Sequence, residues 1–164
     1  MSGIYIHIPY CKQACHYCNY HFSTSLNNKE SVINSMLKEI EIKSVGSNDL
    51  IQTIYFGGGT PSFFATKEIN KIINSIFEKF QISENPEITL EANPDDLSKA
   101  KLIELSQSYI NRLSIGVQSF NDDELKLMNR SHNSNDAKTC IDNALKYYDN
   151  ISIDLIFGMP NSNL

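Results

Sequence analysis

Residues 51–80 read IQTIYFGGGTPSFFATKEINKIINSIFEKF, and this stretch decides the fold class. It begins with a short apolar run, Ile51–Phe56, of the kind that forms a buried β-strand. A glycine turn follows, and apolar residues then recur every three or four positions. This recurrence predicts an amphipathic helix with one apolar face, formed by Ile69, Ile72, Ile73, Ile76, Phe77 and Phe80. The stretch is therefore one strand–turn–helix unit.

The same unit recurs on both sides of this stretch. Further apolar runs lie at Ile4–Ile8, Ile88–Glu91, Leu113–Val117 and Ile151–Phe157. Helical periodicity between them predicts helices over 33–40 (ended by Gly46), over 98–107, from Asn121 with Glu124 as its capping partner, and over 137–148. Strands that alternate with helices predict a parallel sheet with helices packed outside it. Because the strands read as nearly continuous apolar runs, we expect them to be buried on both faces.

The number of these units bounds the architecture. Five units share 164 residues, about 33 residues each, whereas a closed eight-stranded barrel needs roughly 250 residues. The last strand leads into GMPNSNL, residues 158–164, with no helical pattern after it, and a bare sheet edge is a liability. We therefore expect an α/β fold, a partial parallel (β/α) barrel, in which residues 1–164 form one domain that is the N-terminal part of a larger barrel.

Composition and charge exclude several classes of protein. The 14 basic and 19 acidic residues give a net charge of −5, so we expect no nucleic-acid partner. No run of about 18 apolar residues exists, so we expect no membrane-spanning helix. The opening residues, MSGIYIHIPYCK, lack the charged and apolar regions of a secretory signal, which favours a cytoplasmic location. The four cysteines do not suggest a disulfide scaffold.

Three of the cysteines form a compact group directly after the first strand. Cys11, Cys15 and Cys18 have the spacing C-x3-C-x2-C, and thiolates are soft ligands that suit zinc or iron–sulfur clusters. A structural zinc site needs four ligands, so the fourth would have to come from His16, His21 or Cys140. Three thiolates on one loop suit a [4Fe–4S] cluster whose fourth iron stays open, and we prefer this interpretation to zinc or to three ordinary buried cysteines. Cys140 lies in an apolar helical stripe, where core packing is expected.

Two further patterns predict a ligand pocket. The sequence GGGTP, residues 57–61, follows the second strand and lets the backbone approach a ligand closely, although a simple tight turn is the alternative. It has neither dinucleotide nor P-loop spacing. Glu91, Gln118 and Asp154 lie at or near the carboxyl ends of strands, where parallel barrels build their active sites. Ligand contact would explain these polar residues, and satisfaction by the backbone or an arginine is the alternative.

Five stretches carry a resemblance to a known family. Residues 5–20, YIHIPYCKQACHYCNY, resemble the opening of the radical S-adenosylmethionine superfamily, in the branch of oxygen-independent coproporphyrinogen III oxidase and the HemW-type heme chaperones. YFGGGTP, LEANPDD, RLSIGVQSF and IDLIFGMP follow in the family's order. The resemblance implies a partial (β/α)6 barrel with a [4Fe–4S] cluster on Cys11, Cys15 and Cys18. It also implies S-adenosylmethionine contacts from Tyr5, Tyr17, Gly58, Gly59, Thr60, Glu91, Gln118, Arg130 and Asp154.

The resemblance further implies a choice of function. In this superfamily a reduced cluster cleaves S-adenosylmethionine to methionine and a 5′-deoxyadenosyl radical. The oxidase uses that radical to decarboxylate porphyrinogen propionates, whereas the HemW-type relatives hold heme and pass it to an acceptor protein. Asn19 and Tyr20 stand where the oxidase has an extra cysteine, and the first strand begins at Ile4 without the oxidase's N-terminal arm. Both departures favour the heme chaperone, with heme as a further ligand. The oxidase is the alternative function, and a third hypothesis is that the chain is an inert fragment. The sequence identifies neither the electron donor nor the heme acceptor.

Overall fold

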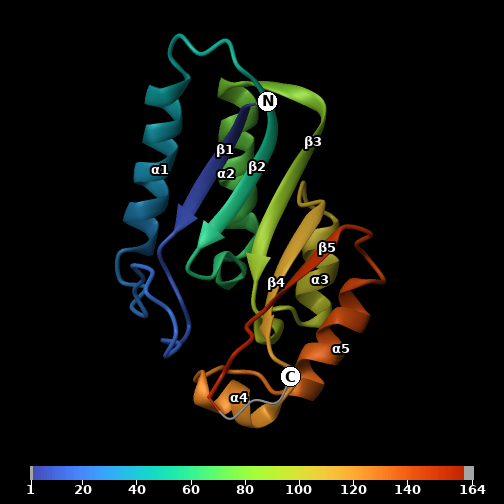
Figure 1. The fold of residues 1–164 in the computed structure, drawn as a ribbon. Coiled ribbons are helices and arrows are strands. Elements are labelled where there is room, and N and C mark those ends of the chain that lie inside the picture. Colours follow the sequence, from blue (N-terminus) through green and yellow to red (C-terminus); the bar gives the residue numbers. More distant parts are fainter. Residues whose placement is uncertain (1, 161–164) are drawn as a thin grey trace.

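The computed structural model describes residues 2–160, which form one parallel five-stranded sheet with its helices (Figure 1). The strands follow one another across the sheet in sequence order: β1 (Ser2–Ile8), β2 (Leu50–Gly58), β3 (Gln81–Ala92), β4 (Arg112–Gln118) and β5 (Ile151–Leu155). The helices are α1 (Lys29–Ser44), α2 (Thr66–Lys79), α3 (Lys99–Ser106), α4 (Asp122–Leu127) and α5 (Ser134–Ala144), with two 3-10 turns, η1 (Pro61–Phe63) and η2 (Pro94–Asp96). The predicted α/β class and parallel sheet are confirmed.

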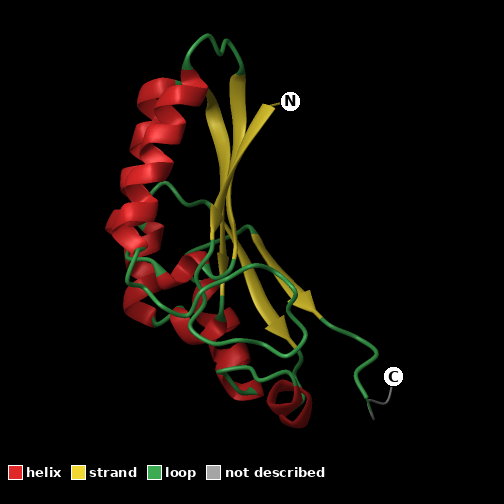
Figure 2. Cartoon of the chain, turned by 90° about the vertical axis from the view of Figure 1, so that its left-hand side faces the viewer, coloured by secondary structure: helices red, strands yellow, loops and turns green. Residues whose placement is uncertain are grey.

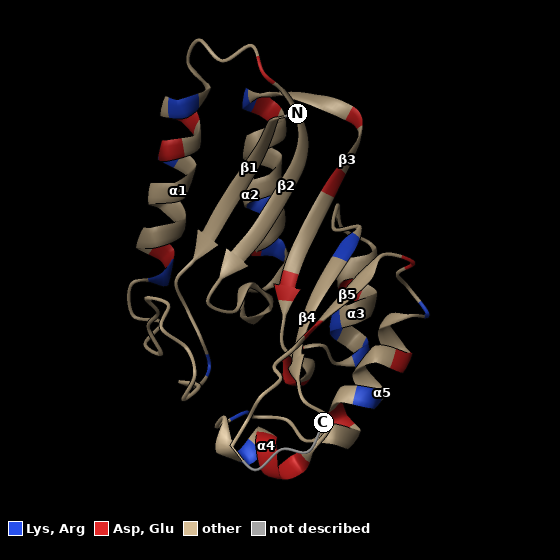
Figure 3. Ribbon diagram, in the orientation of Figure 1, with Lys and Arg blue, Asp and Glu red and all other residues tan. Residues whose placement is uncertain are grey.

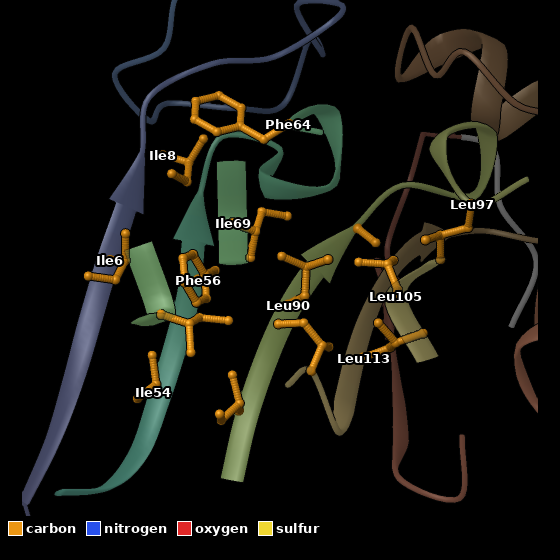
Figure 4. Close-up of a cluster of buried hydrophobic side chains, with 14 of the residues drawn as sticks. Ile6, Ile8, Ile54, Phe56, Phe64, Ile69, Leu90, Leu97, Leu105 and Leu113 are labelled. Carbon is orange, nitrogen blue, oxygen red and sulfur yellow. The ribbon is translucent and has the colours of Figure 1, made fainter. Parts of the chain in front are cut away.

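The helices gather on one side of the sheet (Figure 2). Between the two layers lies a core of branched aliphatic and aromatic side chains (Figure 4). It includes Ile54, Phe56, Leu90 and Leu113 from the strands and the apolar face predicted for α2, of which Ile69, Ile72, Ile73 and Ile76 are fully buried. The core fixes the strands in register, so their carboxyl ends meet at one edge of the sheet.

The expectation that the strands are buried on both faces is wrong for most of the sheet. In β1, Ile6 and Ile8 are buried, whereas Tyr5 and His7, which alternate with them, are exposed. The register of the strands continues this face across the sheet, where it presents polar side chains, among them Thr53, Tyr55, Glu91, Gln118, Ser152 and Asp154. Only β4 is buried along nearly its whole length. We call this second surface the polar face, and it lies opposite the helices.

Several element boundaries differ from the predicted ones. β3 begins at Gln81, seven residues before the predicted strand, and pairs with β2 through a register shift between Ile51 and Thr53. β5 ends at Leu155 rather than Phe157. Gly46 follows α1 with φ 76°, a left-handed conformation that suits its predicted role in ending that helix.

The capping interactions at α4 confirm one half of the predicted pair. Asn121 caps α4 by accepting a hydrogen bond from the backbone N–H of Asp123 (2.9 Å). Glu124 does not return to the Asn121 backbone, as the sequence suggested, because its carboxylate accepts the hydroxyl of Ser119 instead. The predicted pair is therefore a single-sided cap.

Charge is distributed unevenly over the helices. Basic and acidic residues are interspersed on α1 and α5, whereas the first turn of α4 carries Asp122, Asp123 and Glu124 (Figure 3). Within residues 2–160, no helix is both long enough and apolar enough to cross a membrane.

Candidate cluster and cofactor site

A pocket of about 290 Å³ opens where the carboxyl ends of the strands meet the loop after β1. It brings together every residue that the sequence predicts for the site except Tyr5: Cys11, Cys15, Tyr17, Cys18, Gly58, Gly59, Thr60, Glu91, Gln118, Arg130 and Asp154. Its lining also includes Gln13, Tyr20, Phe22, Ala92, Asn93, Ser114 and Gly116. Residues that are up to 143 positions apart in the sequence therefore share one cavity.

The three cysteines lie on an irregular loop that is held against the glycine turn. The backbone N–H of Gly59 donates to the carbonyl of Ile8 (2.8 Å), and that of Thr60 donates to the carbonyl of Tyr10 (2.7 Å). All three thiols are free and partly exposed. Burial raises the pKa of the Cys11 thiol, while a hydrogen bond from Thr60 acts in the opposite direction.

The donor set fits a cluster better than a single metal ion. Among residues 2–160, no three His, Cys, Asp or Glu side chains gather closely enough to hold one metal ion. Zinc needs four ligands around one centre, whereas the cysteines of a cubane each bind a different iron. Thiolates are also the ligands that iron–sulfur clusters use. The three cysteines thus offer the thiolate donors that a [4Fe–4S] cluster uses, and not four ligands around one ion.

Arg130 is the charged group that links the cysteine loop to the sheet. One guanidinium nitrogen donates to the sulfur of Cys15 (3.4 Å) and to the hydroxyl of Tyr17 (3.3 Å). The other donates to the carbonyl of Gly116 (2.6 Å) and to the side-chain oxygen of Asn93 (2.7 Å). Arg130 thus connects the cysteine loop to the ends of β3 and β4 through four hydrogen bonds.

Glu91 is fixed at the floor of the pocket by two donors. The hydroxyl of Tyr55 donates to one carboxylate oxygen (2.8 Å), and the backbone N–H of Gly58 donates to the other (3.0 Å). Burial and the neighbouring carboxylate raise the pKa of Tyr55 to about 12, so this phenol stays a hydrogen-bond donor at neutral pH. The sequence alone leaves open whether the backbone satisfies this carboxylate. One of its two donors is indeed a backbone N–H, that of Gly58.

The glycine turn is required by the packing of the chain itself. Gly58 has φ 109°, and a Cβ there would lie 2.6 Å from the His7 ring. A Cβ on Gly59 would lie 2.5 Å from the carbonyl oxygen of Tyr10. The turn is therefore both tight and close-packed, and its backbone borders the pocket beside the cysteines.

Tyr5 lies on the polar face outside the pocket lining. Its ring stacks on that of Tyr55, with centroids 6.0 Å apart and planes inclined by 22°. Its hydroxyl lies 3.2 Å from Nδ1 of His7. Cofactor contact by Tyr5 stays a prediction, although the residue lies beside the tyrosine that holds Glu91.

Among the residues that sequence reasoning missed, Tyr55 and Asn93 hold the charged groups of the site, Glu91 and Arg130. Asn93 accepts from Arg130 and donates to the hydroxyl of Thr60 (3.2 Å), so it connects the arginine to the glycine turn. Each had a local signal: Tyr55 precedes the glycines by two positions, on the same face of β2 as Gly57, and Asn93 follows directly after β3.

Comparisons with known proteins agree with this geometry. A sequence model of the Radical SAM superfamily matches residues 5–164. The chain is 39% identical to the heme chaperone HemW of Buchnera aphidicola from Acyrthosiphon pisum, over 99% of this chain and 44% of that protein. It is 38% identical to the heme chaperone HemW of Bacillus subtilis, over 100% of this chain and 44% of that protein.

A solved structure shows the same arrangement of elements. The coproporphyrinogen III oxidase HemN of Escherichia coli, described as a radical SAM enzyme, superimposes with a TM-score of 0.89 at 26% identity. The match covers 98% of this chain and 38% of that one. The chain thus spans less than half the length of these relatives. The superfamily implies a [4Fe–4S] cluster and S-adenosylmethionine as cofactors, and three cysteines line the pocket described above. With the superfamily match across nearly its whole length and three cysteines beside a glycine turn at the strand ends, the chain belongs to the Radical SAM superfamily.

Proposed function

We propose that this chain is the cluster-binding and S-adenosylmethionine-binding part of a heme chaperone of the HemW type. The convergence of the cysteine triad with Glu91, Arg130 and Asp154 on one pocket carries the proposal. Curated HemW heme chaperones that match 99–100% of the chain support the choice within the superfamily. In this proposal residues 1–164 are the N-terminal part of a larger barrel, which is consistent with the 44% coverage of those relatives and with the exposed side chains of Ile153 and Leu155 on β5.

The residues of the pocket have chemistry that complements S-adenosylmethionine. Cys11, Cys15 and Cys18 would hold the cluster, which when bound and reduced supplies one electron to the sulfonium. The methionine end of the nucleoside carries an ammonium and a carboxylate group. Arg130 offers a cation to the carboxylate, and the carboxylates of Glu91 and Asp154 can accept from the ammonium or from ribose hydroxyls. The backbone of Gly58 and Gly59 borders the pocket beside these charges.

The partners in this proposal are heme, a one-electron donor and a protein that accepts heme. We place the protein in the cytoplasm, because free thiols belong to a reducing compartment and all four cysteines are free in the structure. The oxidase stays the second candidate, favoured by the likeness to the E. coli coproporphyrinogen III oxidase. Asn19 and Tyr20, in place of the oxidase's additional cysteine, favour the chaperone.

Anaerobic reconstitution tests the cluster site. Cys15→Ala removes one of three protein ligands, so we expect the brown colour to be lost and the iron content to fall to nearly none per chain. Cys140→Ala is the matched control, because Cys140 is buried in α5 at 4% exposure, where burial raises the pKa of its thiol to about 11. This control should keep the full iron content. A Cys15→Ala protein with wild-type iron would refute the ligand assignment.

Two assays on the cluster-loaded protein at its full natural length separate the candidate functions. Heme titration followed by Soret absorbance should show saturable binding. Incubation with coproporphyrinogen III, S-adenosylmethionine and a reductant should leave the porphyrinogen unchanged. Decarboxylated product would establish the oxidase, and absence of heme binding would contradict the chaperone.

A further inference from the structure

The cysteine loop is ordered by partners that lie far from it in the sequence. The loop between β1 and α1 has no helix or strand of its own, and its one piece of regular structure is an isolated β-bridge between Tyr10 and Ser23. Between Cys11 and Cys15, however, three consecutive residues, Lys12, Gln13 and Ala14, each bond to a distant loop. Their partners follow β3 and α4, more than 80 residues later.

The first anchor is the side chain of Asn129. The amide nitrogen of Gln13 donates to both the backbone carbonyl and the side-chain oxygen of Asn129, each at 2.8 Å. The side-chain nitrogen of Asn129 donates in return to the carbonyl of Ala14 (2.7 Å). Next to this contact, the backbone N–H of His16 donates to the carbonyl of Met128 (3.1 Å). Asn129 therefore fixes the segment between Cys11 and Cys15 through its bonds to Gln13 and Ala14.

The backbone of Asn129 shows why asparagine suits this position. Its φ is 57°, and within residues 2–160 the only other non-glycine residue with a positive φ is Gln118. Asparagine enters the left-handed region more readily than most residues. This conformation lets the chain leave α4 and places the side-chain amide against the cysteine loop.

The second anchor is an ion pair made by Lys12, the residue before Gln13 in the same segment. The ammonium of Lys12 lies 2.8 Å from a carboxylate oxygen of Asp95 and 3.5 Å from one of Asp96. The side chains of Asp95 and Asp96 are 16% and 7% exposed, and Asp96 also accepts the hydroxyl of Ser62 (3.1 Å). The LEANPDD stretch, whose acids the sequence leaves without a chemical role, thus fixes the loop to the end of β3.

We propose that Asn129 and Gln13, together with the Lys12–Asp95 pair, form a clamp that shapes the cysteine loop before any cluster is present. Asn129 is a positioning residue in this clamp: it acts on the cysteines through Gln13 and Ala14 and has no role in binding iron. The inference rests on the proposed function for the identity of the bound group. The proposed shaping of the loop does not depend on iron and can be measured on the metal-free chain.

The test compares amide hydrogen exchange in reduced, metal-free protein. Asn129→Gly keeps the φ of 57° accessible and removes both side-chain bonds. We expect exchange in residues 11–18 to accelerate by about tenfold, as for the loss of one or two hydrogen bonds from a local opening unit, while exchange in α2 stays unchanged. Asn121→Gly is the matched control, because it makes the same change at the other end of α4, away from the loop, where glycine is tolerated at an N-cap.

A double-mutant cycle shows whether the two partners act as one clamp. If they do, Gln13→Ala combined with Asn129→Gly should accelerate exchange by less than the product of the two single effects, because both single variants lose the bond between the two side chains. Wild-type exchange in Asn129→Gly, or additive effects in the cycle, would overturn the clamp. Should Asn129→Gly fail to fold, Lys12→Met removes the second anchor and serves the same comparison. Its control is Lys126→Met, because the ion pair between Lys126 and Asp123 lies at the surface.

The rate of anaerobic cluster assembly supplies a second readout. Asn129→Gly should take up iron about tenfold more slowly than wild type, because fewer chains present all three thiols together. Equal rates would count against the clamp. If the wild-type chain takes up no iron at all, the proposed function fails, and the exchange comparison still decides the clamp by itself.

Discussion

At the scale of single residues, the site depends on partners that hold its charged groups in place. Cysteine spacing identified the loop, and the polar ends of the strands identified Glu91, but neither pattern pointed to Tyr55. That contact exists because β2 and β3 pair in a register that places Tyr55 beside Thr89, two positions before Glu91 on the same face. Register depends on tertiary packing, so a local pattern cannot supply it. The cysteine loop and Glu91 were predictable as parts of the pocket, and the residue that orients the carboxylate was not.

Tyr55→Phe should therefore weaken cofactor binding without removing a cofactor contact. The change leaves one oxygen of Glu91 without its donor (2.8 Å in the wild type), so the carboxylate can rotate. We expect S-adenosylmethionine affinity, measured by equilibrium dialysis on the cluster-loaded protein, to fall by about three- to tenfold. Tyr147→Phe, at an exposed position after α5, is the control and should bind as wild type. Unchanged affinity in Tyr55→Phe would show that Glu91 needs no orientation by Tyr55.

At the scale of elements, the strand–helix alternation was readable, but the character of the strands was misread. Ile4, Ile6 and Ile8 dominate the first apolar run and hide the period of two, in which Tyr5 and His7 point to the other face. The early part of β3 was missed for a different reason. Residues 81–87 carry glutamates, an asparagine and a proline, so they have little intrinsic strand preference, and pairing with β2 imposes the conformation.

The contact between α1 and α2 contains an ion pair that titrates. Lys29 on α1 lies 2.7 Å from Glu68 on α2, which also accepts the backbone N–H of Ala65 (2.9 Å) at the start of that helix. Burial acts to raise the pKa of Glu68, but these hydrogen bonds and the Lys29 charge outweigh it, and the pKa is lowered overall. A carboxylate with a lowered pKa stabilises the fold above its unfolded-state pKa, and this stabilisation is lost as the pH falls through its folded-state value.

Glu68→Gln should reveal this titration. At pH 7 we expect the variant to lose on the order of 1 kcal/mol of unfolding free energy, because the pair is partly buried. Below the unfolded-state pKa of about 4.5 the difference from wild type should shrink toward zero. Urea unfolding of both proteins from neutral to acidic pH measures it, and a difference that is independent of pH would assign the effect to helix capping instead of charge.

At the scale of the whole molecule, one apolar layer carries most of the stability. The helices cover one face of the sheet, and the opposite face is polar and lines the pocket. The overall architecture was predictable because five similar units repeat the same pattern. The apolar runs alone did not predict that the core lies on one side of the sheet. A sheet with one polar face and a sheet covered on both faces differ in sequence only at every second strand residue.

Leu90→Ala tests how much that apolar layer contributes to the free energy of unfolding. Leu90 is fully buried between β3 and the helices, so the truncation should cost roughly 2–5 kcal/mol of unfolding free energy. Leu127→Ala, at 48% exposure, makes the same change at the surface and should stay within about 0.5 kcal/mol of wild type. Chemical denaturation measures both, and equal losses would mean that the core is not concentrated between the layers.

The distance in sequence between Cys15 and Arg130 has a consequence for biogenesis. The two residues that meet through a 3.4 Å contact are separated by 115 positions, so the cysteines leave the ribosome long before their neighbours exist. At about 5–20 residues per second, the nascent thiols wait roughly 6–23 s for Arg130 to be synthesised. During this interval the three thiols lack the contact with Arg130 and are accessible to other metal ions and to oxidants. In the proposed function, a cluster can therefore be inserted productively only after the second half of the chain has emerged.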